Sequence, residues 1–222
     1  MLLLAFILVS VAGACTGVGS LLVFCKCITK ENERFLAGAL GFSAGVMLYV
    51  SFIEIFNKSL DGFANSGLPG DHSSGPVYAV TTVTFFSGVF IMWGIEKLVD
   101  LLRNNDDDNL THMGFTTALA IGIHNFPEGV ATFVATLKDP SFGILMAFAI
   151  GVHNIPEGMC VSIPLYYADG SRCKAFLWSL LSGVSEPIGA LLAYLFLSEH
   201  MGPTSFGIIF GLVAGMITYI CM

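Results

Sequence analysis

The first 25 residues, MLLLAFILVSVAGACTGVGSLLVFC (1–25), contain no charged side chain. Residues 76–95 and 201–222 are also uncharged, and about 20 apolar residues in a helix cross the roughly 30 Å hydrocarbon core of a bilayer. The whole chain of 222 residues is 55% hydrophobic and only 11% charged, against roughly 25% charged residues in an average soluble domain. The sequence therefore predicts a helical membrane protein and excludes a soluble globular one.

Neither a β-barrel nor a signal peptide fits these apolar runs as well as membrane helices do. A transmembrane β-barrel needs short segments in which apolar and polar residues alternate, whereas these runs are continuously apolar. The first run could be a signal peptide, because small residues occupy positions 12–15, but no basic residue precedes it and it continues uncharged to Cys25. We interpret it as the first membrane span.

Charged residues divide the rest of the chain into further spans, seven in all. We expect one transmembrane domain, 1–222, with spans at about 2–25, 35–57, 76–98, 113–137, 140–167, 175–198 and 202–222. The predicted fold class is an all-α, polytopic helical membrane bundle.

The distribution of lysine and arginine predicts the orientation of this bundle. The loops after spans one, three and five contain seven basic residues, namely Lys26, Lys30, Arg34, Lys97, Arg103, Arg172 and Lys174. The opposite loops contain only Lys58 and Lys138. Because basic loops stay in the cytosol, the N-terminus should lie outside the cell or in an organelle lumen. The sequence leaves open whether the membrane is the plasma membrane or that of an organelle.

A six-residue motif occurs twice, as HNFPEG (124–129) in the fourth span and HNIPEG (153–158) in the fifth. Five of the six positions are identical. Both motifs lie near the middle of their spans, and Glu186 lies near the middle of the sixth, so that ionisable groups from three helices should meet near the bilayer midplane. An uncompensated acid at that depth costs about 2.5 to 3.5 kcal/mol. A compensating cation is therefore expected.

The spacing within each motif suits metal binding. Histidine and glutamate four residues apart share one helix face, with the asparagine close to it. Prolines 127, 156 and 187 remove backbone hydrogen bonds, and broken or bent helices at the midplane are how transporters build substrate sites. A mixed set of imidazoles and carboxylates suits zinc and also divalent iron, manganese or cobalt. The candidate ligands are His124, Asn125, Glu128, His153, Asn154, Glu157 and Glu186.

These candidate ligands exceed the number that one tetrahedral ion uses. The set could hold two ions that share bridging carboxylates, or successive positions along one path. For the two asparagines, hydrogen bonding between helices is as good an interpretation as metal ligation. Met47, near the middle of the second span, and Glu54, about 10 Å further toward the outer face, are candidate pathway residues. Gly207, Gly211 and Gly215 form a small-residue strip that suits another helix or a second subunit in a homodimer.

At these residues the chain closely resembles the ZIP family of divalent metal transporters, in particular its ZupT-type zinc uptake branch. The two motifs resemble the signature of the family's fourth and fifth helices, SEPIG (185–189) its sixth-helix element and GFSAGVM (41–47) its second. The resemblance implies a binuclear metal centre at the seven candidate ligands and metal movement into the cytosol. The family pattern has an eighth helix that follows the seven spans of this chain, so that this helix is expected to be missing.

Two alternative functions compete with transport of divalent metal ions. An intramembrane metalloenzyme could use zinc to activate water, but the hydrolase motif His-Glu-x-x-His is absent from the sequence. A truncated, non-transporting metal-binding or sensing subunit is the third possibility, and zinc flux would separate it from a carrier. We expect a transporter that is not an enzyme, with metal ions and the lipid bilayer as partners, no catalytic cofactor and no nucleic-acid partner.

Overall fold

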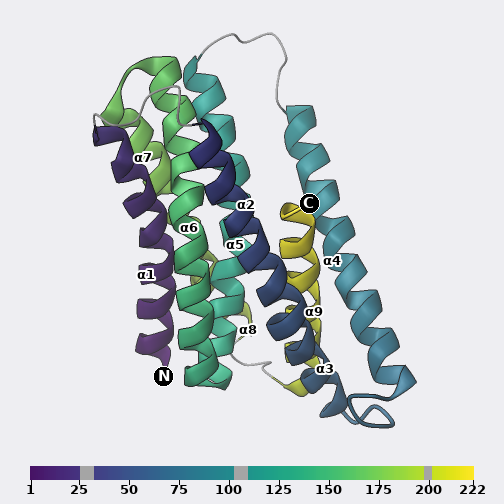
Figure 1. Ribbon diagram of the computed structural model, residues 1–222. Helices are drawn as coiled ribbons and strands as arrows, with labels where there is room; N and C mark the ends of the chain where they lie inside the picture. The colour runs from purple at the N-terminus through teal and green to yellow at the C-terminus, as the bar shows by residue number, and fades with distance from the viewer. Residues whose placement is uncertain (26–32, 103–109, 198–201) are drawn as a thin grey trace.

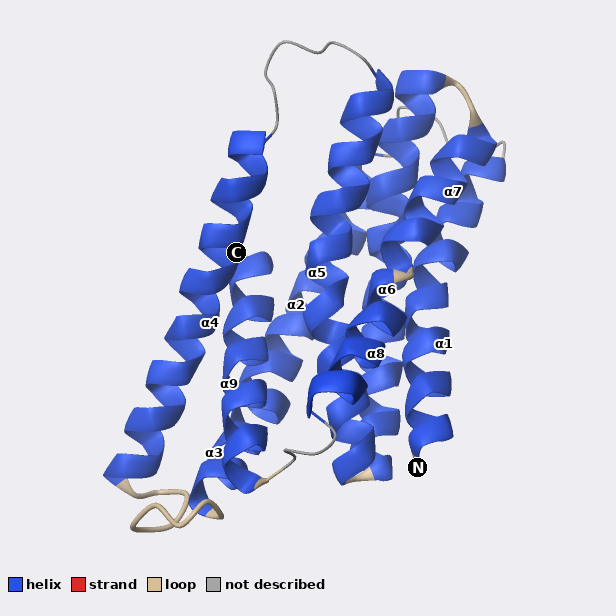
Figure 2. Ribbon diagram, turned by 180° about the vertical axis from the view of Figure 1, so that it is seen from behind, coloured by secondary structure: helices blue, strands red, loops and turns tan. Residues whose placement is uncertain are grey.

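The computed structural model describes residues 1–25, 33–102, 110–197 and 202–222. In these residues the chain forms an all-α bundle, and no strand occurs (Figures 1 and 2). The principal helices are α1 (Leu2–Ser20), α2 (Glu33–Tyr49), α3 (Phe56–Ala64), α4 (Gly75–Leu102), α5 (Leu110–Lys138), α6 (Pro140–Asp169), α7 (Arg172–Gly183), α8 (Ser185–Leu197) and α9 (Pro203–Ile220). The predicted fold class is confirmed.

Six helical segments in the described part of the chain are long and apolar enough to cross a membrane. They are Leu2–Phe24, Ala37–Ala64, Gly75–Leu101, Pro140–Asp169, Arg172–Phe196 and Pro203–Ile220. Helix α5 is not among these six, because His124, Asn125 and Glu128 interrupt its apolar sequence. The chain is therefore a multi-pass membrane protein whose fifth principal helix carries a polar motif at its centre.

Two of the expected spans depart from a single continuous α-helix. The second continues through a π-helical turn, η3 (Val50–Ile55), into α3, so that the helix ends seven residues later than its expected end at residue 57. The sixth span divides into α7 and α8 at Val184, three residues before Pro187, which cannot donate the helical hydrogen bond to Gly183. Pro127 and Pro156, in contrast, lie inside unbroken helices.

The helices form two groups, which α2 with η3 and also α5 connect. Helix α1 packs along α6, and α5 packs between α6 and α8, whereas α4 and α3 pack against α9. Helix α2 contacts α6, and η3, which follows it, contacts α9 (Figure 1). The N-terminus, the 65–74 loop and the α5–α6 connection at Asp139 lie at the same end of the bundle (Figure 1).

The glycine strip on α9 is occupied within the chain. A Cβ at Gly207 would lie 2.9 Å from the ring of Phe63 on α3, and one at Gly211 would lie 2.9 Å from Ser59 and Thr84. At Gly215 it would collide with the carbonyl of Phe85 on α4. The close approach of another helix expected at this strip is confirmed, and α3 and α4 are the helices that pack on it, so the strip needs no second subunit to cover it.

The three basic residues Lys26, Lys30 and Arg103 lie outside the described residues. Of the remaining basic residues predicted to be cytosolic, Lys97 is near the end of α4 and Arg172 and Lys174 begin α7. Lys58 and Lys138 lie toward the opposite end of the bundle, in α3 and at the end of α5.

Candidate metal centre

A short connection sets the two motifs at the same depth. Helices α5 and α6 run antiparallel and are joined by Asp139 alone, whose carboxylate caps α6 by accepting hydrogen bonds from the backbone N–H of Ser141 (2.9 Å) and Phe142 (3.4 Å). Pro140 occupies the first turn, where its missing N–H costs nothing. His124 and His153 lie at almost equal distances along the chain from Asp139, so that the two histidines meet.

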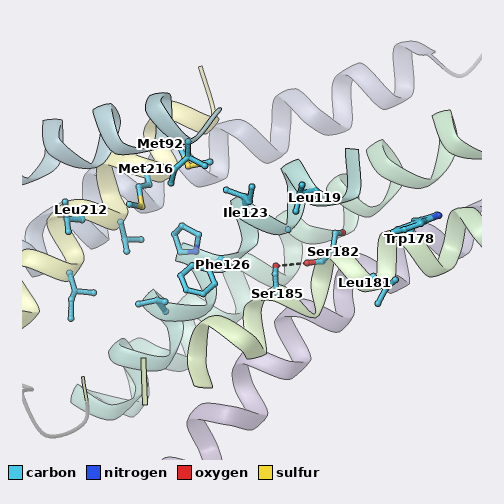
Figure 3. A pocket seen from close by; sticks show the side chains of 16 residues that line it. Met92, Leu119, Ile123, Phe126, Trp178, Leu181, Ser182, Ser185, Leu212 and Met216 are labelled. Carbon is cyan, nitrogen blue, oxygen red and sulfur yellow. Dashed lines mark hydrogen bonds between the residues drawn. The ribbon is translucent and has the colours of Figure 1, made fainter. Parts of the chain in front are cut away.

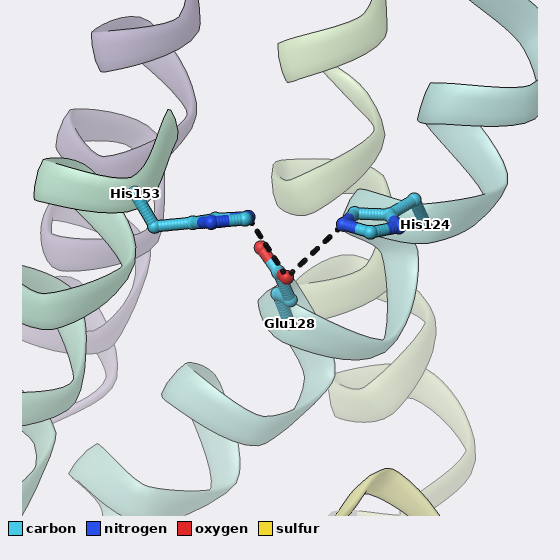
Figure 4. A group of neighbouring side chains, drawn as sticks. All are labelled: His124, Glu128 and His153. Atoms are coloured by element: carbon cyan, nitrogen blue, oxygen red, sulfur yellow. Dashed lines mark ion pairs between the residues drawn. The ribbon is translucent and has the colours of Figure 1, made fainter. Parts of the chain in front are cut away.

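The motif side chains form a compact group, which we call the His/Glu cluster: His124, Glu128, His153 and Glu157. Glu128 Oε1 lies 3.8 Å from His124 Nε2 and 3.6 Å from His153 Nε2 (Figure 4). Glu157 Oε1 is 3.8 Å from His124 Nε2, and the two imidazole rings stack with centroids 5.8 Å apart. Two ligand atoms on one tetrahedral zinc ion are roughly 3.3 Å apart. Small side-chain movements would therefore bring these atoms into coordination distance.

Almost all of the seven predicted ligands are buried. The exposed fractions are 0% for Asn125, Asn154 and Glu186, 1% for Glu128 and 6% for His153 and Glu157. In the described part of the chain, Lys58, Lys97 and Lys174 pair with other acids, and the only ion pairs of Glu128 and Glu157 are with histidines. No fixed cation among the described residues therefore balances these carboxylates.

Four buried polar atoms at the centre have no hydrogen-bond partner among the described residues. They are Glu128 Oε2, His153 Nε2, Asn154 Oδ1 and Glu186 Oε2. A buried polar atom without a partner costs roughly 1 to 3 kcal/mol. The three oxygens, and Nε2 when the His153 proton is on Nδ1, are lone-pair donors of the kind that a divalent cation accepts, so the donor set fits a metal ion.

The two motif asparagines donate hydrogen bonds to carboxylates of the following span. With its nitrogen turned toward α6, the Asn125 amide donates to Glu157 Oε1 at 2.8 Å and to Oε2 at 3.1 Å. Asn154 Nδ2 donates to Glu186 Oε1 on α8 at 2.5 Å and to the carbonyl of Ala12 on α1 at 2.8 Å. Each asparagine thus orients a glutamate, while Asn154 still presents an oxygen that no described donor occupies.

The last residue of each motif explains how α8 and α1 reach the centre. A Cβ at Gly129 would lie 2.6 Å from Cα of Glu186, and one at Gly158 would lie 2.8 Å from the carbonyl carbon of Thr16. Only glycine permits these backbone approaches. Gly129 therefore places Glu186 beside Glu128, and Gly158 places α1 beside Asn154.

Ser43 is a functional candidate that sequence reasoning did not select. Its Oγ lies 2.5 Å from His153 Nδ1 and donates to the His153 carbonyl at 3.3 Å. If Nδ1–H donates to Ser43, then Nε2 keeps a free lone pair for metal. The only sequence signal was a small polar residue in an apolar span, within the 41–47 segment.

The two predicted pathway residues are not part of the cluster. Met47 is fully buried in the main apolar core, one turn after Ser43. Glu54 is partly exposed in the π-helical turn, and no described contact joins it to the cluster. Their roles along a metal path remain predictions.

The surroundings of the cluster differ on its two sides. Toward the Asp139 end lie core residues that include Phe133, Phe142, Met146 and Phe210. On the opposite side a cavity of about 280 Å³ is lined by His124, His153 and Glu157 from the cluster and by Leu40, Ser43, Ala44, Ile121, Cys160, Ile220 and Cys221. The cluster is therefore closed toward one end of the bundle and faces a cavity toward the other.

A second cavity lacks side chains that would bind a divalent metal ion. It measures about 670 Å³ between α4, α5, α7, α8 and α9, and side chains such as Met92, Ile123, Phe126 and Met216 line it (Figure 3). None of the seven predicted ligands lines it, and its only side-chain hydroxyls belong to Ser182 and Ser185. It is unsuited to a divalent cation.

Comparison with known proteins agrees with this chemistry. A family model described as ZIP Zinc transporter matches residues 103–222. The chain is 46% identical to the zinc transporter ZupT of Oceanobacillus iheyensis over 237 residues, which cover 100% of this chain and 86% of that protein. It is 47% identical to the ZupT of Nitratidesulfovibrio vulgaris (99% and 85%) and 46% identical to that of Lysinibacillus sphaericus (99% and 85%).

Proposed function

This chain belongs to the ZIP family of zinc transporters, and on that premise we propose that it moves Zn²⁺ across the membrane through the His/Glu cluster. The observation that carries the proposal is the set of ligand atoms from His124, Glu128 and His153 within 4.8 Å of one another in a membrane bundle. A bound cation would offset the charge of the buried carboxylates.

We propose two ion positions that share carboxylates. An ion at the first position would bind His124, Glu128, His153 and Glu157. The other would use the unpartnered oxygens of Asn154 and Glu186 together with Glu128 Oε2. Iron, manganese or cobalt would suit the same nitrogen and oxygen donors, whereas a hydrolytic role is not proposed, since the similar proteins are named as transporters.

The cavity supports a direction for transport. It extends from the cluster toward the ends of α6 and α9 and the start of α5, that is, toward the side with Arg172 and Lys174. By the positive-inside rule this side is cytosolic. In this arrangement the cluster is closed to the outside and open toward the cytosol, and uptake requires the apolar layer around Phe133 and Phe210 to separate in a second arrangement.

Some features of the whole protein remain predictions. The N-terminus is proposed to lie outside the cell or in an organelle lumen. A homodimer would need a surface other than the α9 glycine strip, which α3 and α4 cover.

Zinc uptake into proteoliposomes that contain the 222-residue chain tests the proposal. We expect saturable flux from the unchanged protein and from Glu96→Gln, because Glu96 is an exposed carboxylate on α4 whose hydrogen-bond partner is Tyr219 and not a residue of the cluster. Glu157→Gln should lose the flux, because it removes a carboxylate of the cluster. Equal flux in both variants would show that the cluster is not on the metal path.

A further inference from the structure

Two thiols line the cavity between the His/Glu cluster and the predicted cytosolic side. Cys160 lies on α6 and Cys221 directly follows α9, and both share the wall of the 280 Å³ cavity with His124, His153 and Glu157. Both are free, partly buried cysteines. The two cysteines are far apart in the sequence, and neither belongs to one of the sequence motifs described above.

Helix geometry places Cys160 between the His/Glu cluster and the predicted cytosolic end of α6. It is three residues after Glu157 and seven after His153, so all three lie on one face of α6. At 1.5 Å per residue its Cα is about 10 Å from that of His153, in the direction of Gly170 at the end of the helix. Cys160 therefore lines the cavity beyond the cluster in the direction of the predicted cytosolic side.

The donor chemistry of this second position differs from that of the cluster. The cluster offers nitrogen and oxygen, whereas thiolates favour zinc and softer cations. Glu157 and Cys160 are three residues apart on one face of α6, and Cys221 lines the same cavity from the end of α9. The ligand atoms of the three residues do not all lie within 4.8 Å of one another, so that the side chains must turn into the cavity to share one ion. Each thiol releases a proton to water in the cavity when it binds metal.

We propose that Cys160 and Cys221, with Glu157, form a sulfur-containing binding position for a thiophilic divalent cation, Zn²⁺ or Cd²⁺, on the cytosolic side of the cluster. The passage of the ion rests on the proposed transport function, but the binding position itself does not. A buried cysteine is often only a packing residue. Cys15 on α1 is such a case, since its thiol donates to the Val11 carbonyl (3.3 Å), whereas Cys160 and Cys221 make no hydrogen bond to a described residue.

Cadmium titration of the purified protein in detergent tests this position. Cadmium bound to thiolate gives a near-ultraviolet charge-transfer band that cadmium on imidazole or carboxylate does not give. We expect the band in the unchanged protein and in the controls Cys15→Ser and Cys173→Ser, which change a partly buried and an exposed cysteine outside the cavity. The double variant Cys160→Ser/Cys221→Ser should lose it.

Far-ultraviolet circular dichroism checks that each variant remains helical. If the double variant does not fold, the single variants Cys160→Ser and Cys221→Ser replace it, and each should weaken the band. An unchanged band in these variants, or no band in the unchanged protein, overturns the proposal. Zinc flux separates the two proposals: a cysteine-dependent band without flux contradicts transport alone, whereas flux without a band contradicts the thiol position alone.

Discussion

At the scale of single residues, hydrogen bonds orient the metal-binding side chains. Asn125 donates to Glu157, Asn154 donates to Glu186, and Ser43 contacts His153 Nδ1. Such outer contacts fix which atom of a ligand faces the metal. The repeated asparagine therefore has a structural reason, because in each motif it donates to a carboxylate of the following span.

Ser43→Ala should weaken zinc binding by about 10- to 100-fold, as is usual when a partner behind a ligating histidine is removed. The reason is that His153 loses the contact that fixes its ring and tautomer. Isothermal titration calorimetry of the purified protein measures this change. Ser73→Ala, which alters an exposed loop serine, is the matched control and should bind zinc normally. Unchanged affinity in Ser43→Ala would remove Ser43 from the site.

Glu128→Gln should abolish high-affinity zinc binding and leave the helical content unchanged. The Glu128 carboxylate lies between both imidazoles, and its neutral amide replacement cannot offset the charge of a divalent cation. The same calorimetric titration, with circular dichroism of the variant, checks both parts. Glu96→Gln is again the control. Zinc affinity equal to that of the unchanged protein would contradict a shared centre.

At the scale of helices, glycines set how closely the elements approach. Gly129 meets the backbone of Glu186 on α8, and Gly158 meets that of Thr16 on α1. Small residues of this kind permit close helix packing in membranes. The glycine that ends both motifs thus serves the packing that brings a third carboxylate and the Ala12 carbonyl to the centre.

Gly158→Ala should destabilise the fold by about 1 to 3 kcal/mol, the usual cost of overpacking. The added methyl group would meet the Thr16 backbone, which cannot turn aside as a side chain can. Thermal unfolding in detergent measures the effect. Gly45→Ala on α2 is the matched control, because a Cβ there meets nothing within 4 Å. A melting temperature equal in both variants would show that α1 adjusts without cost.

At the scale of the whole molecule, the bundle is asymmetric about its metal centre. Apolar core residues fill the Asp139 side, and the cavity occupies the side of Arg172 and Lys174. Packing alone does not say which side is cytosolic; the proposed orientation rests on the basic residues at the cavity side.

The orientation can be tested with a membrane-impermeant maleimide. We expect exposed Cys173, in the first turn of α7, to react only after the cells are permeabilised, because this end of the bundle is on the basic side. Ser73→Cys, in the 65–74 loop at the other end of the bundle, should react in intact cells. Cys173→Ser identifies the signal that belongs to Cys173. The opposite pattern of labelling would reverse the proposed direction of transport.

The sequence by itself determined the fold class and the polar motifs, because both are written in local patterns. Charge-free runs of about 20 residues specify membrane helices whatever their neighbours, and two copies of one motif at mid-span place His124 and His153 at one depth. The effect of Pro187 was also local, since a proline removes a hydrogen bond within its own helix.

Only the tertiary structure decided which residues meet. Ser43 contacts His153 from 110 positions away, Asn154 reaches Ala12 across 142, and the glycine strip of α9 is covered by α3 and α4. The cavity with Cys160 and Cys221 also depends on how α6 and α9 pack. The physical reason is that a helix pattern fixes which face is polar or small, whereas the neighbour of that face depends on the packing of all the helices together.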